Sequence, residues 1–383
     1  MNKKVLSFFT ALIIIFSCSV FSYAEENKFL ENMSCESAVL MEQDTGKILM
    51  SKNAEEKRAP ASITKIMTML LIIEEIEKGN ISENDMIRTS SNAKMMGGSE
   101  IFLAEGEEMS LGDMLKGIAV ASANDAAVAV AEYISGTEEA FVDKMNERAK
   151  QLNMTNTHYI NCHGLDEDNH YTCAKDVAIA TRELMKHEKI KDYTTIWMDT
   201  LRNGASELVN TNRLIRFYRG ATGLKTGTTE NAGHCLSATA ERDGLKLIAV
   251  VMGCKTGKER FEEASEILDY GFANYINCPL PPSAYETYLI PVVGGNVEYV
   301  KGVADIPKSI FTAKNQKNEI NIKVNICDKL TAPVDKNQIL GRIEILLGEN
   351  VHSVYPIHAE NAIKKRTLVE SLKFMWKILS KLE

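Results

Sequence analysis

The chain lacks the patterns that mark zinc sites, disulfide frameworks and nucleic-acid surfaces. Its eight cysteines are scattered without a C-x-x-C pair, which argues against zinc and against a set of paired disulfides. A net charge of −8, with no basic stripe in the body of the chain, argues against a nucleic-acid partner. His158, His163 and His170 lie in a polar, loop-like stretch that does not indicate metal binding, so we expect no metal and no cofactor.

An apolar run opens the chain. Residues 5–16 are too few to span a membrane comfortably, and Lys3 and Lys4 give the segment a positive start. Ser22-Tyr23-Ala24 then offers small residues at the two positions that a signal peptidase reads. We therefore predict a signal peptide over residues 1–24, cleaved after its last residue, and an exported protein. An uncleaved N-terminal anchor is the alternative.

Cys18 raises a third possibility, lipidation, but Phe16 fits a lipoprotein signal poorly. Cleavage of the signal removes Cys18 and leaves seven cysteines, an odd number. For an exported protein this indicates a weakly oxidising environment or mostly buried thiols.

At 383 residues, with 45% hydrophobic and 25% charged residues, the chain is long enough for two folded domains. In residues 25–276, strand patterns at 38–50 and 234–252 flank helical patterns, and Asp243-Gly244 is a hairpin signal. We predict an α/β (α+β) domain whose antiparallel sheet pairs the first strands with the last and is flanked by helices. Helices are expected at 60–79, 111–133, 140–152, 174–186 and 261–275.

A proline cluster at 278–282 predicts a linker. Beyond it, short alternating runs separated by turn residues predict a small all-β domain over residues 277–356. This domain has no cluster of catalytic residue types, so we interpret it as a spacer or docking module. The predicted strands lie at 288–293, 297–300, 320–326 and 339–347.

The C-terminal segment, residues 357–383, carries an amphipathic helical pattern. Apolar residues recur at three- and four-residue steps, and the remaining positions are basic in an otherwise acidic protein. We predict a helix that lies in the membrane interface and holds the protein at the outer face of the cytoplasmic membrane. A terminal helix packed on the protein is the alternative. The apolar positions are Leu368, Leu372, Met375, Trp376, Leu379 and Leu382.

Ser62-Ile63-Thr64-Lys65 places a hydroxyl and an amine on one face at the start of a predicted helix. Serine needs a base to act as a nucleophile, and a lysine serves as that base only when burial or a nearby positive charge lowers its pKa. The helix N-terminus also directs backbone N–H groups toward a developing oxyanion. Ser91 and Lys94 have the same spacing, but they lie in a polar stretch, and we give them no catalytic role.

Ser122-Ala123-Asn124 interrupts an apolar helical pattern, where polar side chains are costly unless they have a role. A second hydroxyl can relay a proton to a leaving amine, and an asparagine can hold both a lysine and a substrate carbonyl. A harmless surface break is the alternative. The same spacing also occurs at Ser51 to Asn53 and at Ser90 to Asn92, in settings that do not interrupt a helix.

Lys225-Thr226-Gly227 leads into the late hairpin. Its lysine offers charge, its threonine offers a hydroxyl, and its glycine lets a bound backbone approach closely. The copy at Lys255-Thr256-Gly257 lies in a turn before the closing helix, so we assign the chemistry to the first copy.

Each element is short, and their order along the chain is what is specific. With that order, the chain resembles the serine D-alanyl-D-alanine carboxypeptidases of the low-molecular-mass penicillin-binding proteins. The resemblance covers nearly the whole mature chain and implies their β-lactamase-like catalytic fold, β-rich C-terminal domain and amphipathic anchor. Further matching segments are Leu103 to Glu107, Asn161 to Asp166, Asn210 to Asn212, Thr222 to Gly227 and Ala249 to Gly253.

The resemblance implies how these residues would act in catalysis. Ser62 would attack the carbonyl between the two terminal D-alanines of a peptidoglycan stem peptide, with Lys65 accepting its proton, and water would later hydrolyse the acyl-enzyme. The backbone N–H groups of Ser62 and Thr228 would form the oxyanion hole. Ser122 would protonate the departing D-alanine, and Lys225 would hold Ser122 and lower the pKa of Lys65. A β-lactam would acylate Ser62 and leave slowly.

The resemblance also implies the substrate-binding residues. Asn124 would orient the peptide, Thr226 and Arg260 would bind its C-terminal carboxylate, and Gly227 would let its backbone lie close. The one departure from the family pattern is Ala123, where the family often has glycine, and we expect this small change to be tolerated.

Three other functions share parts of the pattern. A class A β-lactamase needs a deacylating glutamate in a Glu-x-x-Leu-Asn run, but Ala149 occupies that position before Leu152-Asn153. An endopeptidase on the same fold would cleave cross-linked dimers, and a wall-binding protein without catalysis would not need all three elements. We therefore predict a D-Ala-D-Ala carboxypeptidase.

Overall fold

The structure is a computed structural model that describes residue 29 and residues 33–380, so the predicted signal peptide over 1–24 lies outside the described residues. The chain divides into two compact units between Ala273 and Asn274. The first unit contains all of the predicted catalytic residues, and the second is rich in strands.

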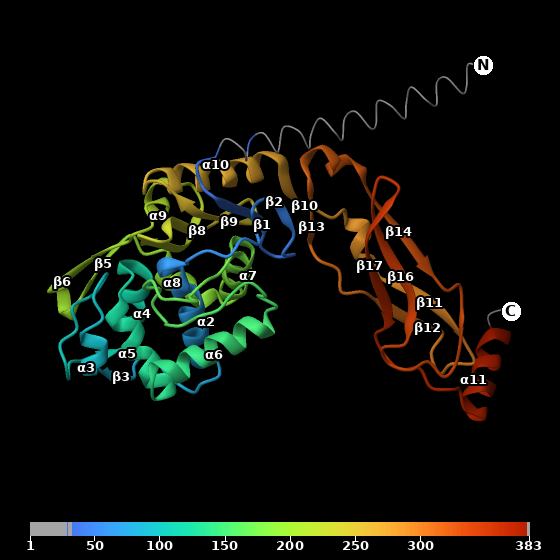
Figure 1. The fold of residues 1–383 in the computed structure, drawn as a ribbon. Coiled ribbons are helices and arrows are strands. Elements are labelled where there is room, and N and C mark those ends of the chain that lie inside the picture. The colour runs from blue at the N-terminus through green and yellow to red at the C-terminus, as the bar shows by residue number, and fades with distance from the viewer. Residues whose placement is uncertain (1–28, 30–32, 381–383) are drawn as a thin grey trace, which may run out of the picture. The chain divides into compact units, whose positions relative to one another are not determined.

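A five-stranded antiparallel sheet, in the order β2-β1-β9-β8-β7, forms the centre of the first unit (Figure 1). Ser37 of β1 pairs with Met252 of β9, which confirms that the first strands pair with the last. Asp243 and Gly244 join β8 to β9 with φ of 51° and 78°, as a tight hairpin turn requires. The strands of this unit are β1 (Ser37–Glu42), β2 (Ile48–Lys52), β3 (Met86–Arg88), β4 (Glu108–Ser110), β5 (Met198–Leu201), β6 (Ser206–Val209), β7 (Ala221–Thr229), β8 (Gly233–Arg242) and β9 (Leu245–Cys254).

Helices cover both faces of this sheet (Figure 1). Val39 and Ile248 point into the same core as α2 and α7, whereas Leu40 and Leu247 contact α10 at Gly271. Successive side chains of a strand point to opposite faces, so each central strand contributes to both layers. The helices of this unit are α2 (Lys65–Glu77), α3 (Ser91–Lys94), α4 (Leu111–Lys116), α5 (Asn124–Ser135), α6 (Glu138–Gln151), α7 (Ala174–Leu184), α8 (Lys191–Thr194), α9 (Leu214–Phe217) and α10 (Glu259–Asn274).

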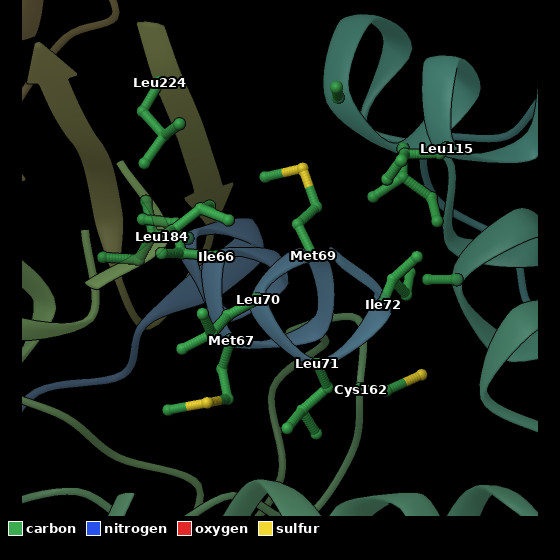
Figure 2. Close-up of a cluster of buried hydrophobic side chains, with 14 of the residues drawn as sticks. Ile66, Met67, Met69, Leu70, Leu71, Ile72, Leu115, Cys162, Leu184 and Leu224 are labelled. Atoms are coloured by element: carbon green, nitrogen blue, oxygen red, sulfur yellow. The ribbon is translucent and has the colours of Figure 1, made fainter. Parts of the chain in front are cut away.

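Helix α2 is the centre of the hydrophobic core. Every residue from Lys65 to Ile73 is buried, because the apolar residues occupy the whole circumference of the helix. Figure 2 shows its side chains projecting in several directions, among them toward Leu184, Leu224 and Leu115. A helix of this kind cannot turn its first residue to solvent, so Lys65 is held in an apolar environment.

The helical region predicted at 111–133 is broken where the sequence indicates. Helix α4 continues into a short π-helical segment, η2 (Gly117–Ala121), and α5 begins at Asn124. Between them Ser122 has a left-handed backbone conformation (φ 66°, ψ 30°), which residues other than glycine rarely adopt. Irregular backbone of this kind is concentrated at functional sites.

The second unit is β-rich, as predicted. It has a six-stranded sheet in the order β14-β16-β17-β12-β11-β15 and a two-stranded sheet of β10 and β13. Ile290, Val300, Ile343 and Ile357 lie in its core. The strands are β10 (Tyr275–Pro279), β11 (Tyr288–Val293), β12 (Tyr299–Val303), β13 (Ser309–Ala313), β14 (Ile320–Ile326), β15 (Leu330–Thr331), β16 (Ile339–Leu347) and β17 (Asn350–Ala359).

The predicted linker at 278–282 is only partly irregular. Strand β10 runs to Pro279, which pairs with Ser309 of β13. A proline can occupy this position because β10 has β13 as its single neighbour, so one side of the strand needs no donor.

The helix predicted from residue 357 begins later than the sequence suggests, at α11 (Leu368–Leu379). Strand β17 continues through Pro356 to Ala359, and Ile363 still forms a bridge with Val334. The prediction of helix over 357–367 is therefore wrong. Among the described residues, no helix is both long and apolar enough to cross a membrane.

Candidate active site

Ser62 and Lys65 lie where a short 3₁₀ turn, η1 (Ala61–Thr64), passes into α2. The Nζ of Lys65 lies 3.1 Å from the Oγ of Ser62. Ser62 is half-buried, whereas Lys65 is 0% exposed. Burial lowers the pKa of Lys65 to about 7, although Cys162 and Asp125 act in the opposite direction. The amine can therefore gain and lose a proton near neutral pH, as a general base must.

Two further oxygens hold the Lys65 amine. Its Nζ donates to Asn124 Oδ1 at 2.6 Å and to the backbone carbonyl oxygen of His163 at 2.6 Å. With Ser62, these give three acceptors, one for each N–H of an ammonium group. Of the three partners, only the Ser62 hydroxyl has a proton to give when the amine is neutral. The geometry thus directs proton transfer from Ser62 to Lys65.

The second element is positioned by its own backbone and side-chain contacts. Asn124 donates through its backbone N–H to Ser99 O at 2.7 Å and through Nδ2 to Gly97 O at 2.8 Å. This fixes the amide so that Oδ1 faces Lys65. Ser122, two residues earlier, is 4% exposed at the break before α5. The first and second elements therefore meet at Lys65.

The third element lies on β7, at the edge of the sheet and against η1. A Cβ on Gly227 would lie 3.0 Å from the backbone nitrogen of Ser62 and 3.0 Å from Ala61 Cβ, so a larger residue would push strand and turn apart by a few tenths of an ångström. Lys225 is 0% exposed, and burial, followed by the charges of Lys65 and Arg260, holds its pKa well below the usual range.

Lys225 contacts its own strand. Its Nζ donates to the carbonyl oxygen of Thr226 at 3.0 Å, and the expected contact with Ser122 is absent from the hydrogen bonds of the described residues. Burial, rather than Lys225, is also the main cause of the lowered pKa of Lys65. The hydroxyl of Thr226 donates to Thr211 Oγ1 at 2.7 Å.

Arg260 reaches this strand from the first turn of α10. Its Nη1 donates to Gly227 O at 3.0 Å and to Thr228 Oγ1 at 2.9 Å. Its Nε is buried without a hydrogen-bond partner among the described residues, so the guanidinium keeps donor capacity. The end of β7 therefore brings together the hydroxyls of Thr226 and Thr228, the guanidinium of Arg260 and the buried amine of Lys225.

Comparison with known proteins identifies this arrangement. The family model described as D-alanyl-D-alanine carboxypeptidase (peptidase S11) matches residues 23–256, and that of the penicillin-binding protein 5 C-terminal domain matches residues 285–365. The chain is 43% identical over 367 residues to the D-alanyl-D-alanine carboxypeptidase DacF of Bacillus subtilis, covering 94% of each chain.

The chain belongs to the D-alanyl-D-alanine carboxypeptidase family. It is therefore an enzyme of the serine hydrolase type. It is also 31% identical to DacC of Escherichia coli, covering 92% of this chain and 90% of that one. The crystal structure of penicillin-binding protein 5 from Haemophilus influenzae has a TM-score of 0.74 at 29% identity, covering 87% of this chain and 98% of that chain. The predicted fold class is thus confirmed.

Penicillin-binding protein D2 of Listeria monocytogenes, solved in an ampicillin-bound form, is 28% identical to this chain. The TM-score is 0.58, and the match covers 63% of this chain and 98% of that chain.

Sequence reasoning assigned no role to the loop from Asn161 to Asp166, although it matches the family. Asn161 Oδ1 accepts the N–H groups of His163 and Gly164, which shapes the loop so that the His163 carbonyl meets Lys65. Asp166 accepts the Thr229 hydroxyl at 2.7 Å and the Asn231 N–H, which ties the loop to the end of β7. The short Asn-x-x-Gly run, typical of a turn, is the signal that could have located it.

The buried His170 holds η1 in place through a hydrogen bond to Thr64. The Nδ1 of His170 accepts the N–H of Ile160 at 2.9 Å, so its Nε2 carries the proton and donates to Thr64 Oγ1 at 2.9 Å. Thr64 in turn donates to Ala61 O at 2.9 Å. Burial lowers the pKa of His170 to about 4, so the ring is neutral at physiological pH.

The repeated short motifs have structural roles. Thr256 and Glu259 hydrogen-bond to each other's backbone N–H and form a capping box at the start of α10. Ser90 caps α3 by accepting the N–H of Ala93. Their sites lie outside the cluster around Lys65.

Proposed function

We propose that the enzyme removes the terminal D-alanine from peptidoglycan stem pentapeptides ending in D-Ala-D-Ala, through an acyl-enzyme on Ser62. The observation that carries this proposal is the pairing of Ser62 with a fully buried Lys65 whose pKa burial lowers to about 7. Such an amine is neutral in a substantial fraction at neutral pH, and it contacts one proton donor, the nucleophile itself.

In the first step, Ser62 Oγ attacks the carbonyl carbon between the two terminal D-alanines while its proton passes to Lys65 Nζ. The N–H groups of Ser62 and Thr228 stabilise the oxyanion, which is consistent with the close approach of Gly227 to the Ser62 nitrogen. The C–N bond then breaks, and Ser122 delivers a proton to the departing amine of D-alanine. The product is an ester on Ser62 and free D-alanine.

Substrate recognition rests on the end of β7. Thr226 and Arg260 bind the C-terminal carboxylate of the peptide through the Thr226 hydroxyl and the Arg260 guanidinium. Asn124 orients the peptide backbone, because its amide is already fixed by Gly97 and Ser99. A water activated by Lys65 then hydrolyses the ester and regenerates Ser62.

The same chemistry accounts for inhibition by β-lactams. Attack by Ser62 opens the ring C–N bond, but the leaving nitrogen stays tethered to the acyl group, so the ester is released slowly. Support comes from the Listeria protein, which is similar to this chain and was solved in an ampicillin-bound form. A β-lactamase or a non-catalytic wall-binding role is not favoured by the relatives, which are named as carboxypeptidases.

The test is product analysis on a defined D-Ala-D-Ala pentapeptide. We expect release of free D-alanine, its loss in Ser62→Ala, and loss of covalent labelling by a fluorescent penicillin in the same variant. Ser91→Ala is the matched control, since Ser91 and Lys94 repeat the spacing in α3 outside the site. Cleavage of cross-linked dimers without D-alanine release would indicate an endopeptidase, and labelling that survives in Ser62→Ala would contradict the acyl-enzyme.

We also propose that residues 1–24 direct export and that α11 anchors the enzyme at the outer face of the membrane. Large apolar side chains of α11 are exposed, with Leu368 at 79% and Trp376 at 77%. Lys364, Lys365 and Lys373 place positive charge around them, which suits an anionic lipid surface.

The anchor is tested by vesicle co-sedimentation with anionic lipid. The double variant Leu372→Asp with Trp376→Asp should lose vesicle binding, whereas Leu289→Asp, at an exposed apolar residue of β11, should retain it. N-terminal sequencing of the exported protein distinguishes this anchor from an uncleaved signal. If removal of residues 368–383 leaves the protein equally membrane-bound, the proposal fails.

A further inference from the structure

Two cysteines and a glutamate meet beside α10, where β1 begins and β9 ends. They are separate from the residues that act in catalysis. Cys35 directly precedes β1, Cys254 ends β9, and Glu263 lies in the second turn of α10. One potential ligand atom from each lies within 4.8 Å of the other two. All three are buried, with Cys35 and Cys254 at 1% and Glu263 at 7% exposed.

The strand register explains why the two thiols meet. Ser37 of β1 pairs with Met252 of β9, and the strands are antiparallel. Two residues before Ser37 and two residues after Met252, the same register places Cys35 opposite Cys254. The contact therefore follows from the pairing of β1 with β9 inside the sheet.

Glu263 is a buried carboxylate without a cationic partner. Among the described residues it forms no ion pair; its oxygens accept the backbone N–H groups of Ser34 and Cys35 and a contact from Cys254 Sγ. Burial alone would raise its pKa, but the hydrogen bonds from Cys35 and Ser34 outweigh it, and the pKa is lowered. Buried charges in proteins are normally paired or bound to a metal, so this anion lacks its counter-charge.

The distance between two of the ligand atoms fits a tetrahedral metal ion. Cys254 Sγ lies 3.6 Å from Glu263 Oε2. With metal–sulfur and metal–oxygen distances of about 2.3 and 2.1 Å, two ligands of a tetrahedral zinc ion are also about 3.6 Å apart. The backbone N–H groups that hold the carboxylate correspond to the outer hydrogen bonds that orient ligands in metal sites.

A cavity of about 280 Å³ adjoins the cluster at Glu263. It is lined by Phe29, Met33 and Ser34 and by one acidic face of α10. Negative charge along such a cavity raises the local concentration of cations, and the cavity leaves room for a water molecule as a fourth ligand. The acidic residues are Glu259, Glu262, Glu263 and Glu266.

We propose that Cys35, Cys254 and Glu263 bind one thiophilic divalent cation, Zn²⁺ by class, with a water from the acidic cavity completing the site. Binding converts two thiols to thiolates and releases two protons. Because both thiols must lose their protons to bind the ion, binding strengthens as the pH rises. The ion would join the N-terminal arm, β9 and α10, the helix that also carries Arg260.

Cobalt titration of the purified, thiol-reduced protein tests the site directly. We expect one Co²⁺ per chain, thiolate-to-cobalt charge-transfer bands in the near ultraviolet, and displacement of Co²⁺ by one Zn²⁺. Cys35→Ser, Cys254→Ser and Glu263→Gln should each weaken Co²⁺ binding by more than roughly 100-fold, since even outer partners of metal sites cost 10- to 100-fold. Cys327→Ser, in the second unit, should leave it unchanged.

Three outcomes would overturn the proposal. The first is absence of charge-transfer bands in the wild-type protein, and the second is Co²⁺ binding that survives all three variants. The third is an intramolecular disulfide in the exported protein, seen as a mass lower by about two hydrogens with two fewer titratable thiols. Near-UV circular dichroism of each variant verifies its fold, and the wild-type titration stands without any variant.

Discussion

The Nζ of Lys65 lies 2.6 Å from the Oδ1 of Asn124, the first residue of α5. This one contact joins the helix that carries the nucleophile to the break that carries Ser122. It also means that any charge placed at position 124 acts directly on the base.

The rate of acylation should depend on the protonation of Lys65. Only the neutral amine accepts the Ser62 proton, and the pKa of Lys65 is about 7, so the neutral fraction grows as pH rises through that value. We expect the rate of fluorescent-penicillin acylation to fall about tenfold per pH unit below pH 7 and to level off above it. A rate that is flat between pH 5 and 8 would argue against Lys65 as the base.

Asn124→Asp should move that profile. A carboxylate at hydrogen-bond distance favours the charged form of Lys65 and raises its pKa. The midpoint of the acylation profile should shift to higher pH by about one to three pH units. Asn92→Asp, on the exposed surface of α3, is the control and should leave the midpoint in place.

Gly164→Ala should damage the site through its backbone. A Cβ at Gly164 would lie 1.9 Å from the carbonyl oxygen of Ala61, so the loop must move away from η1 and take the His163 carbonyl from Lys65. Gly136→Ala is the matched control, because its φ is also positive (83°) and its Cβ would meet nothing within 4 Å.

Both variants carry the conformational cost of a left-handed alanine, about 1 kcal/mol in unfolding free energy. Only Gly164→Ala should also lose acylation, by tenfold or more. Equal acylation rates in the two variants would show that the loop does not position Lys65.

Arg260→Ala should weaken binding of the peptide carboxylate. A hydrogen bond to a charged group contributes about 1.5–3 kcal/mol, so KM for a substrate with a free C-terminus should rise about 10- to 100-fold. A C-terminally amidated peptide should bind wild type and variant alike. Lys258→Ala removes a neighbouring exposed charge that pairs with Glu262. It should change neither the KM of the peptide with a free C-terminus nor the binding of the amidated peptide.

His170 should make the catalytic unit sensitive to acid. Its pKa is about 4 in the folded protein and near 6.5 when unfolded, so the unfolded chain binds more protons between those values and stability falls as pH drops through them. We expect a loss of about 3 kcal/mol in unfolding free energy from pH 6.5 to pH 4. His170→Asn cannot take up this proton. In urea denaturation between pH 4 and 6.5, the slope of its unfolding free energy against pH should be smaller than that of the wild type by about 1.4 kcal/mol per pH unit.

Much of the catalytic unit can be predicted from local signals. The Asp243-Gly244 hairpin, the helix after Pro60 and the break at Ser122 each follow from a few neighbouring residues, and the structure contains all three. The choice of Lys225 over Lys255 also depends on local setting, since one copy precedes a hairpin and the other precedes a helix.

The contacts that complete the site are long-range and leave no such signal. His163 contributes a backbone carbonyl, which any residue could supply, so its identity says nothing of its contact with Lys65. The contact that the resemblance implies between Lys225 and Ser122 depends on a side-chain orientation that spacing cannot specify.

The start of α11 carries a local sequence signal of its own. Thr367 and Glu370 form a capping box, in which each side chain accepts the other's backbone N–H. The Thr-x-x-Glu run marks the helix start eleven residues beyond Pro356. Pro356 itself does not end β17, because β12 pairs only with His358 and Ala359, and at Pro356 the strand lacks that neighbour.

Because β1 pairs with β9, the central sheet can form only after β9 has been synthesised. In a chain that emerges from its N-terminus, β1 is made roughly 200 residues before its partner, and no nearer strand can close that edge of the sheet. Cys35 and Ser62 are likewise made long before β9, α10 and Arg260. Any chain that stops short of β9 therefore lacks the middle of its sheet, and cells should degrade it as unfolded protein rather than retain a half-active fragment.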